Sequence, residues 1–140
     1  MSSMMPCQLQ CPHCGNEQEL EIWGSVNVKL DPELKEKLLG GEINVFACEK
    51  CGKRTFYDAP LLYHDMELHF CIQYIPPEEL DDPSLFQRFA LDGTLPVRED
   101  DPTRSLPDLQ YVLRPHIVFD MGELLRYVAF RDAIAAASKR

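Results

Sequence analysis

The sequence has few basic residues and no long apolar run. Its 140 residues include 14 Lys and Arg against 23 Asp and Glu, a formal net charge of −9. This deficit of positive charge disfavours a protein that coats DNA or RNA, or that binds anionic membranes. No run reaches 18 apolar residues, so we expect no transmembrane helix. The first residues, MSSMMPCQLQ, lack the charged and then apolar regions of a secretory signal. We therefore expect a cytoplasmic protein whose thiols stay reduced.

Several catalytic motifs are also missing. The sequence contains no Gly-rich phosphate loop, no G-x-S-x-G, no HExxH and no pair of carboxylates at a convincing spacing. Their absence argues against the common classes of nucleotide-binding protein, serine hydrolase and metalloprotease. Because nothing else in the sequence indicates a reaction, our working expectation is a protein that is not an enzyme.

The composition is that of a soluble globular protein. Apolar residues make up 45% and charged residues 26% of the chain, which argues against disorder throughout. A chain of this length corresponds to one domain, and we take residues 1–140 as a single unit. The character of the chain changes at Pro76-Pro77, because residues 76–115 hold seven of the eleven prolines.

Two short cysteine motifs are the strongest signal. Residues 11–15 read CPHCG and residues 48–52 read CEKCG. Two residues between cysteines allow both sulfurs of a turn to face one metal, and the following glycine can adopt the positive φ that folds the backbone around it. The motifs predict a closed, structural site for one Zn²⁺ with four thiolate ligands, namely Cys11, Cys14, Cys48 and Cys51.

Three alternatives to zinc remain open. The four thiols could carry no metal. They could hold iron, as in rubredoxin-like sites, since thiolates bind iron as well. Either Cys-x-x-Cys pair could also exchange between thiol and disulfide, although such a redox motif usually occurs singly at a helix N-terminus.

At these residues the sequence resembles the CpXC proteins, an uncharacterised bacterial and archaeal family named for its Cys-Pro-x-Cys motif. The resemblance rests on CPHCG at 11–15, SVNVKLDPELKEKLLGGEI between the pairs, INVFACEKCG at 43–52 and LLYHD at 61–65. It covers residues 11–75 and, more loosely, 109–130. It implies a core like a zinc ribbon and no known activity. The second pair here lacks the proline of the first, which leaves the predicted ligands intact.

The fold class predicted from the pattern is α+β, an antiparallel sheet with the zinc ribbon at one end. Residues 1–10 show no periodicity and predict a loose start. Alternating apolar residues predict strands over 17–30, with a bulge or break at Gly24-Ser25, and over 61–75. Asp31-Pro32 and Gly40-Gly41 bracket a short helix at 32–39. Residues 43–47 and 54–58 predict two short strands beside the second cysteine pair.

The second half of the chain is predicted in less detail. Asp82-Pro83 indicates a further helix start that Asp92-Gly93 ends, and residues 93–108 predict an irregular loop. Residues 109–119 are rich in β-formers around Pro115, which favours an edge strand. Asp120, with Glu123 three residues later, resembles a capping box before a helix over 121–137. The segment 76–108 is thus a variable region, and 109–138 a strand followed by a helix.

The remaining reactive residues favour structural interpretations over chemical ones. For Cys7 we favour an exposed thiol on a flexible tail over an extra ligand, for Cys71 a partly buried strand residue over a nucleophile, and for His13 an exposed side chain. His64 and Asp65 favour a polar turn over catalysis, although a histidine beside an acid can titrate near neutral pH. His69 and Cys71 would share one face of a strand, but no third group is evident to orient them.

The function that follows is a small zinc-stabilised module that binds another protein. Its contact surface would be an exposed strand edge, the proline-rich stretch or an apolar helix face. A zinc ribbon that binds nucleic acid is an alternative, because Lys50, Lys53 and Arg54 cluster at the second cysteine pair. A thiol-redox or iron protein is the other alternative.

Overall fold

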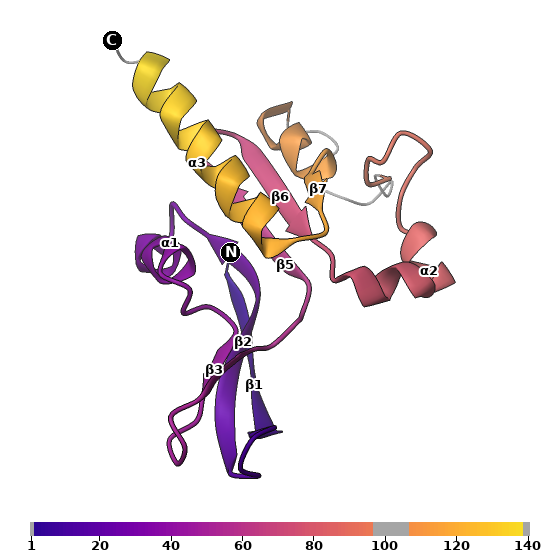
Figure 1. Ribbon diagram of the computed structural model, residues 1–140. Coiled ribbons are helices and arrows are strands. Elements are labelled where there is room, and N and C mark those ends of the chain that lie inside the picture. The colour runs from indigo at the N-terminus through magenta and orange to yellow at the C-terminus, as the bar shows by residue number, and fades with distance from the viewer. Residues whose placement is uncertain (1, 97–106, 139–140) are drawn as a thin grey trace.

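The chain forms an α+β fold around a mixed five-stranded sheet (Figure 1). The structure is a computed structural model that describes residues 2–96 and 107–138. The sheet has the order β1-β2-β5-β6-β7, and a separate two-stranded sheet pairs β3 with β4. The strands of the larger sheet are β1 (Ser3–Gln10), β2 (Glu17–Asn27), β5 (Leu61–Asp65), β6 (Phe70–Tyr74) and β7 (His116–Val118).

The expectation of a purely antiparallel sheet is wrong. β1–β2 and β5–β6 are antiparallel, whereas β2–β5 and β6–β7 are parallel. Parallel neighbours need a long crossover, and the chain has two. Residues 28–60 carry it from β2 to β5, and residues 75–115 carry it from β6 to β7.

The N-terminal segment is a strand rather than the predicted loose start. β1 pairs with β2 from Ser3↔Ser25 to Gln10↔Glu17, and the register shifts between Ser3 and Met4. That shift leaves Gly24 without a partner, which confirms the predicted bulge. β1 lies at the end of the sheet, where Pro6 is tolerated because an edge strand has one side that needs no donor. Because most of β1 is exposed, its sequence lacks the alternation of apolar residues that would have predicted a strand.

The predicted long strand over 61–75 is a hairpin, β5 and β6 joined by a tight turn. The Asp65 carboxylate accepts hydrogen bonds from the backbone N–H groups of Glu67 (2.9 Å) and Leu68 (2.8 Å). His69 then takes a positive φ of 56°, which reverses the chain. Apolar residues inside the turn continued the alternation of the strands, so the periodicity did not mark the break.

The crossover from β2 to β5 carries α1 (Pro32–Leu39) and the small sheet of β3 (Val45–Ala47) and β4 (Arg54–Phe56). α1 has the predicted bounds, and Leu34 and Leu38 bury one face of it against the core. The Asp31 side chain makes no capping hydrogen bond, contrary to its predicted role. An eight-residue helix is unstable alone, so this packing holds it.

The segment after β6 begins with a 3-10 helix (Pro77–Asp81) and the short α2 (Pro83–Phe86). The Asp82 carboxylate caps α2 by accepting from the Ser84 N–H at 3.0 Å, as predicted. Part of the predicted irregular loop, 97–106, lies outside the described residues. Beyond it, Pro107–Leu113 is a 3-10 helix rather than the predicted β-rich segment. Only β7 is a strand there, and it lies at the predicted sheet edge.

The C-terminal helix α3 (Met121–Ser138) covers one face of the sheet (Figure 1). The Asp120 carboxylate accepts from the Glu123 N–H at 3.1 Å, which confirms the predicted cap. Leu124 and Val128 are fully buried in a core that also contains Tyr63, Phe70 and Ile72. Within the described residues, no helix combines the length and the apolar character needed to cross a bilayer.

Truncation of Leu124 tests this packing. Leu124→Ala should lower the free energy of unfolding by about 2–5 kcal/mol, because a fully buried leucine leaves a cavity when shortened. Ile134→Ala is the control on the same helix, since Ile134 is 45% exposed, and it should cost well under about 1 kcal/mol. Urea titration monitored by circular dichroism measures both, and equal losses would contradict the packing described.

Candidate metal centre

The two cysteine motifs form two copies of one turn. CPHCG connects β1 to β2, and CEKCG connects β3 to β4. In the first, the Gly15 N–H donates to the Cys11 carbonyl at 3.0 Å, and in the second the Gly52 N–H donates to the Cys48 carbonyl at 2.9 Å. The two glycines have φ of 78° and 75°, as predicted from their place after each second cysteine.

Backbone N–H groups in both turns point at the first sulfur. The His13 N–H donates to Cys11 Sγ and the Cys51 N–H to Cys48 Sγ, both at 3.4 Å. The N–H of Cys51, and after it that of Lys50, lowers the pKa of the Cys48 thiol to about 6. Such hydrogen bonds favour the thiolate, the form that ligates metals.

The structure brings all four predicted ligand residues together. Their sulfurs lie within 4.8 Å of one another. Cys11 Sγ lies 3.7 Å from Cys51 Sγ, and Cys14 Sγ lies 3.5 Å from Cys48 Sγ. A tetrahedral site with metal–sulfur bonds of about 2.3 Å requires sulfur–sulfur edges of about 3.8 Å. The four cysteines can therefore hold one metal ion without rearrangement of the turns.

The centre is open on one side only. Cys11 and Cys48 are 3% and 4% exposed, whereas Cys14 and Cys51 are exposed. The two buried cysteines pack with Phe46, and Leu9 and Leu20 border this small cluster. Because all four positions of a tetrahedron are taken by sulfur, a metal here would have no place for water or substrate.

Polar side chains that the sequence analysis missed join the two turns. Gln18, on β2, donates to the Ala47 carbonyl at 2.8 Å and accepts from the Glu49 N–H at 3.0 Å. Asn16 donates to the Gln18 side chain at 3.0 Å and approaches Cys48 Sγ at 3.8 Å. Their only sequence signal was their place just after the first motif, which does not reveal a partner thirty residues away.

Asn44 makes a second link between the small sheet and β2. Its side-chain oxygen accepts from the Trp23 N–H at 2.7 Å, and its amide donates to the Trp23 carbonyl at 3.0 Å. Asn44 is 2% exposed and has a φ of 56°, a conformation that asparagine tolerates better than most residues. The Asn44 side chain thus makes the two hydrogen bonds to the Trp23 backbone that a neighbouring strand would otherwise make, beside the bulge at Gly24.

The other residues near the two turns lie outside the cluster. His13 is exposed, as expected. Cys7 is not on a flexible tail, because it is a half-buried residue of β1 paired with Leu20. Lys50, Lys53 and Arg54 are exposed, and the Arg54 guanidinium donates to the Gly41 carbonyl at 3.2 Å.

The polar residues of the β5–β6 hairpin have separate partners. Cys71 is 2% exposed, and burial raises the pKa of its thiol to about 12, which disfavours the reactive thiolate at neutral pH. Asp65 holds the turn, as predicted. His69 lies in the turn before β6 rather than on the strand, and both it and Cys71 line the same cleft. His64 instead hydrogen-bonds to Tyr111, which the sequence analysis did not identify.

Thiol alkylation should separate Cys71 from Cys7. In the folded protein, iodoacetamide should modify Cys71 at least about tenfold more slowly than Cys7, because the reagent needs an accessible thiolate. After unfolding in urea, the two should react at similar rates. Peptide mass spectrometry measures both sites in one sample. Modification of Cys71 as fast as Cys7 in the native state would contradict the burial described and return Cys71 to the candidate nucleophiles.

The comparisons with known proteins add one result to this geometry. No curated protein and no solved structure matches the chain. The family model described as CpXC protein matches residues 9–135, which span both cysteine motifs, the sheet from β2 onward and most of α3. The chain belongs to the CpXC protein family.

Proposed function

We propose that the chain is a small protein-binding module held together by one structural Zn²⁺ bound to Cys11, Cys14, Cys48 and Cys51. The observation that carries the proposal is the approach of four sulfurs from two turns to tetrahedral distances. A site with no open position fits a structural metal rather than a catalytic one. The proposal includes a reducing, cytoplasmic setting, since oxidation would remove the thiolate ligands.

The arrangement of the sulfurs supports a metal over a thiol-redox pair. A redox Cys-x-x-Cys motif joins its own two sulfurs in a bond of about 2.05 Å. Here all four sulfurs gather within 4.8 Å, with approaches of 3.5 Å from Cys14 to Cys48 and 3.7 Å from Cys11 to Cys51, so neither motif stands apart as a separate redox pair. Iron would accept the same four ligands, so metal identity is an outcome of the test below.

Charge argues against the nucleic-acid alternative. Four thiolates and one Zn²⁺ would change the net charge from −9 to about −11, a potential that repels phosphate. The basic residues of the second turn stand beside Glu49, and Arg54 is engaged with the Gly41 carbonyl. No aromatic cluster on that turn offers a surface for stacked bases.

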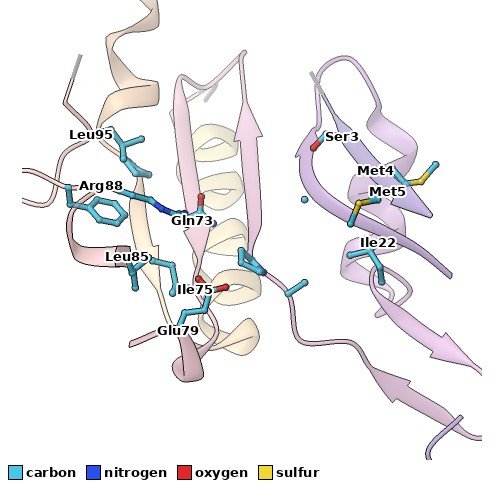
Figure 2. Close-up of a pocket in the computed structure, with 15 residues that line it drawn as sticks. Ser3, Met4, Met5, Ile22, Gln73, Ile75, Glu79, Leu85, Arg88 and Leu95 are labelled. Atoms are coloured by element: carbon cyan, nitrogen blue, oxygen red, sulfur yellow. The ribbon is translucent and has the colours of Figure 1, made fainter. Parts of the chain in front are cut away.

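An edge strand beside an apolar cleft supports the protein-binding role. β1 ends the sheet, so one of its edges has no strand neighbour among the described residues. A cleft of about 610 Å³ adjoins it, with Met4, Met5 and Ile22 on one side and Leu85 and Leu95 on the other (Figure 2). Met4 and Met5 are 42% and 62% exposed, and methionine adapts to varied partners. An extended peptide segment of a partner could pair with β1 and place apolar side chains in this cleft.

Metal content tests whether the four cysteines hold a structural zinc. The full chain, purified without added metal, should contain one zinc per molecule by elemental mass spectrometry. Cys48→Ser should lower zinc affinity at least about tenfold and unfold the two turns, because metal binding and folding are coupled in such sites. Cys7→Ser is the matched control, since Cys7 lies on β1 outside the cluster, and it should keep one zinc.

Three other results would contradict a structural zinc. Iron at one atom per chain would replace the structural zinc with an electron-transfer centre. A Cys48→Ser protein with unchanged melting temperature and unchanged amide spectrum would show that the cluster does not hold the fold. No metal, with reversible oxidation within each motif, would favour the redox alternative.

Site-specific cross-linking tests whether β1 and the adjoining cleft bind a partner protein. A photoreactive residue at Met5, inside the cleft, should cross-link to one partner protein in cells. The same residue at Glu21, on the neighbouring strand β2 and outside the cleft lining, is the control. The cross-linked partner, purified, should bind the wild type and lose at least about tenfold affinity for Met5→Asp, with Met5→Leu unchanged. Equal yields at both positions, or capture of a second copy of this chain, would contradict a specific partner.

A further inference from the structure

A second cleft lies at the end of the sheet away from the cysteine turns. It has a volume of about 450 Å³ and is lined by residues of the β5–β6 turn, β6, the 3-10 helix Pro107–Leu113 and α3. Its lining includes two arginines, two histidines and two tyrosines, namely Arg114, Arg131, His69, His116, Tyr111 and Tyr127. Neither the metal centre nor the β1 edge uses these residues.

The charge of this lining is opposite to that of the chain. Acidic residues outnumber basic ones by 23 to 14, yet no carboxylate is among the residues that line the described cleft. Two arginines gathered in one cleft create a local positive potential that attracts anions, although the charge of Asp92 reaches Arg114. The described lining therefore carries positive charge in a protein whose net charge is −9.

Among residues 2–96 and 107–138, Arg131 is held in place without an ion-pair partner. Its guanidinium carbon lies 4.2 Å from the centre of the Phe70 ring, and one of its N–H groups donates to the Tyr127 hydroxyl at 3.1 Å. Among the described residues, the ion pair nearest to it in sequence joins Asp132 to Lys35 at 2.9 Å and leaves Arg131 out. A stacked and oriented guanidinium retains further N–H donors for a planar pair of oxygens.

Arg114, the second arginine of the cleft, is more exposed than Arg131. Arg114 is exposed at the end of the 3-10 helix. Its charge contributes to the lowered pKa of Asp92, but hydrogen bonds from the Thr94 hydroxyl and N–H contribute more. Since the Asp92 oxygen already accepts both of those bonds, at 2.6 and 3.0 Å, Arg114 can turn toward an anion in the cleft without leaving a buried charge.

Stacked rings form the walls. His69 stacks on Tyr111 with ring centres 5.1 Å apart and planes 2° apart, and His116 stacks on Tyr127 at 4.0 Å and 8°. The hydrogen bond with His64 holds the Tyr111 side chain in place. His69 reaches this position through its positive φ of 56°, a conformation that is strained for a residue other than glycine. Strained residues of this kind concentrate at functional sites.

We propose that this cleft binds a small phosphorylated molecule, with the phosphate between Arg114 and Arg131 and the organic part against the histidine–tyrosine walls. Arginine matches phosphate oxygens through paired hydrogen bonds, and imidazole N–H groups add donors. The volume exceeds that of inorganic phosphate, so it leaves room for an attached group, and flat walls favour a planar one. Cys71 lies in the lining as a neutral thiol, so the proposal is binding alone, without a covalent step.

Histidine resonances provide the readout. The chain has four histidines, His13, His64, His69 and His116, so each imidazole signal can be assigned by single substitution. The full zinc-loaded chain is titrated with inorganic phosphate and with phenyl phosphate, at ionic strength held constant with sodium chloride. The His69 and His116 signals should shift in a saturable way while His13 does not move. Phenyl phosphate should bind at least about fivefold more tightly than inorganic phosphate.

Substitutions decide whether the arginines are responsible. Arg114→Gln should weaken phenyl phosphate binding at least about tenfold, as should Arg131→Gln. Arg131 also packs on Phe70, so Arg131→Lys serves as a second variant that keeps charge and stem. It should bind at least about threefold more weakly than wild type, because lysine lacks the planar fork. Arg126→Gln is the matched control on α3, since Arg126 is exposed and outside the cleft lining, and it should bind within twofold of wild type.

Three results would overturn the proposal. Shifts that grow linearly, or that sodium chloride alone reproduces, would show screening without a site. Equal affinity in the Arg114→Gln and wild-type proteins would place the anion elsewhere. Phenyl phosphate binding no tighter than sodium benzoate would show general anion attraction. The zinc content of each variant, measured in the same samples, separates these outcomes from any failure of the metal centre.

Discussion

The four-sulfur cluster is the contact on which the arrangement of the small sheet depends. β3 and β4 have three residues each, and a two-stranded ribbon of that size has too few hydrogen bonds to be stable in water. It lies on β2 through Gln18, Asn44 and the convergence of the two cysteine turns. The sulfurs also set the geometry of the β1–β2 turn. One ion bound there would therefore fix two hairpins relative to each other, whereas the larger sheet relies on its apolar core.

The molecule separates two kinds of surface. The cysteine turns and the exposed edge of β1 belong to one end of the fold, where Met4, Met5 and Phe56 are exposed. The cleft beneath the β5–β6 turn belongs to the other end, where arginines, histidines and tyrosines gather. The sheet connects the two ends through β2 and β5, which pair in parallel. The two proposals thus use different residues and can be right or wrong independently.

The parts of the fold that the sequence predicted are local. The bounds of α1 and α3, the caps at Asp82 and Asp120 and the two glycine-closed turns all depend on residues within a few positions of one another. The four cysteines could be grouped because their two motifs are alike, and each turn is specified by residues adjacent in sequence. The bulge at Gly24 was also visible, since glycine in an alternating strand is unusual.

The parts that the sequence did not predict are non-local. β1 shows no alternation because most of it is exposed, and only its partner β2 makes it a strand. The two parallel pairings depend on where long crossovers return, which periodicity does not encode. Gln18 and Asn44 look like ordinary polar residues until their partners, over twenty positions away, are known. The same holds for Tyr111, whose hydrogen bond with His64 spans 47 positions.

The parallel pairing of β6 with β7 has a consequence for how the chain folds. β1 and β2 can meet by closing a short turn, but β7 reaches β6 only after the chain has closed a loop of about forty residues. The entropy cost of closure rises with loop length, so the long-range pair forms late. Until then α3 has no complete surface to cover, and the apolar face of β5 and β6 stays open to water. During synthesis this face emerges before the helix that buries it, an order that favours transient exposure of an apolar strand pair.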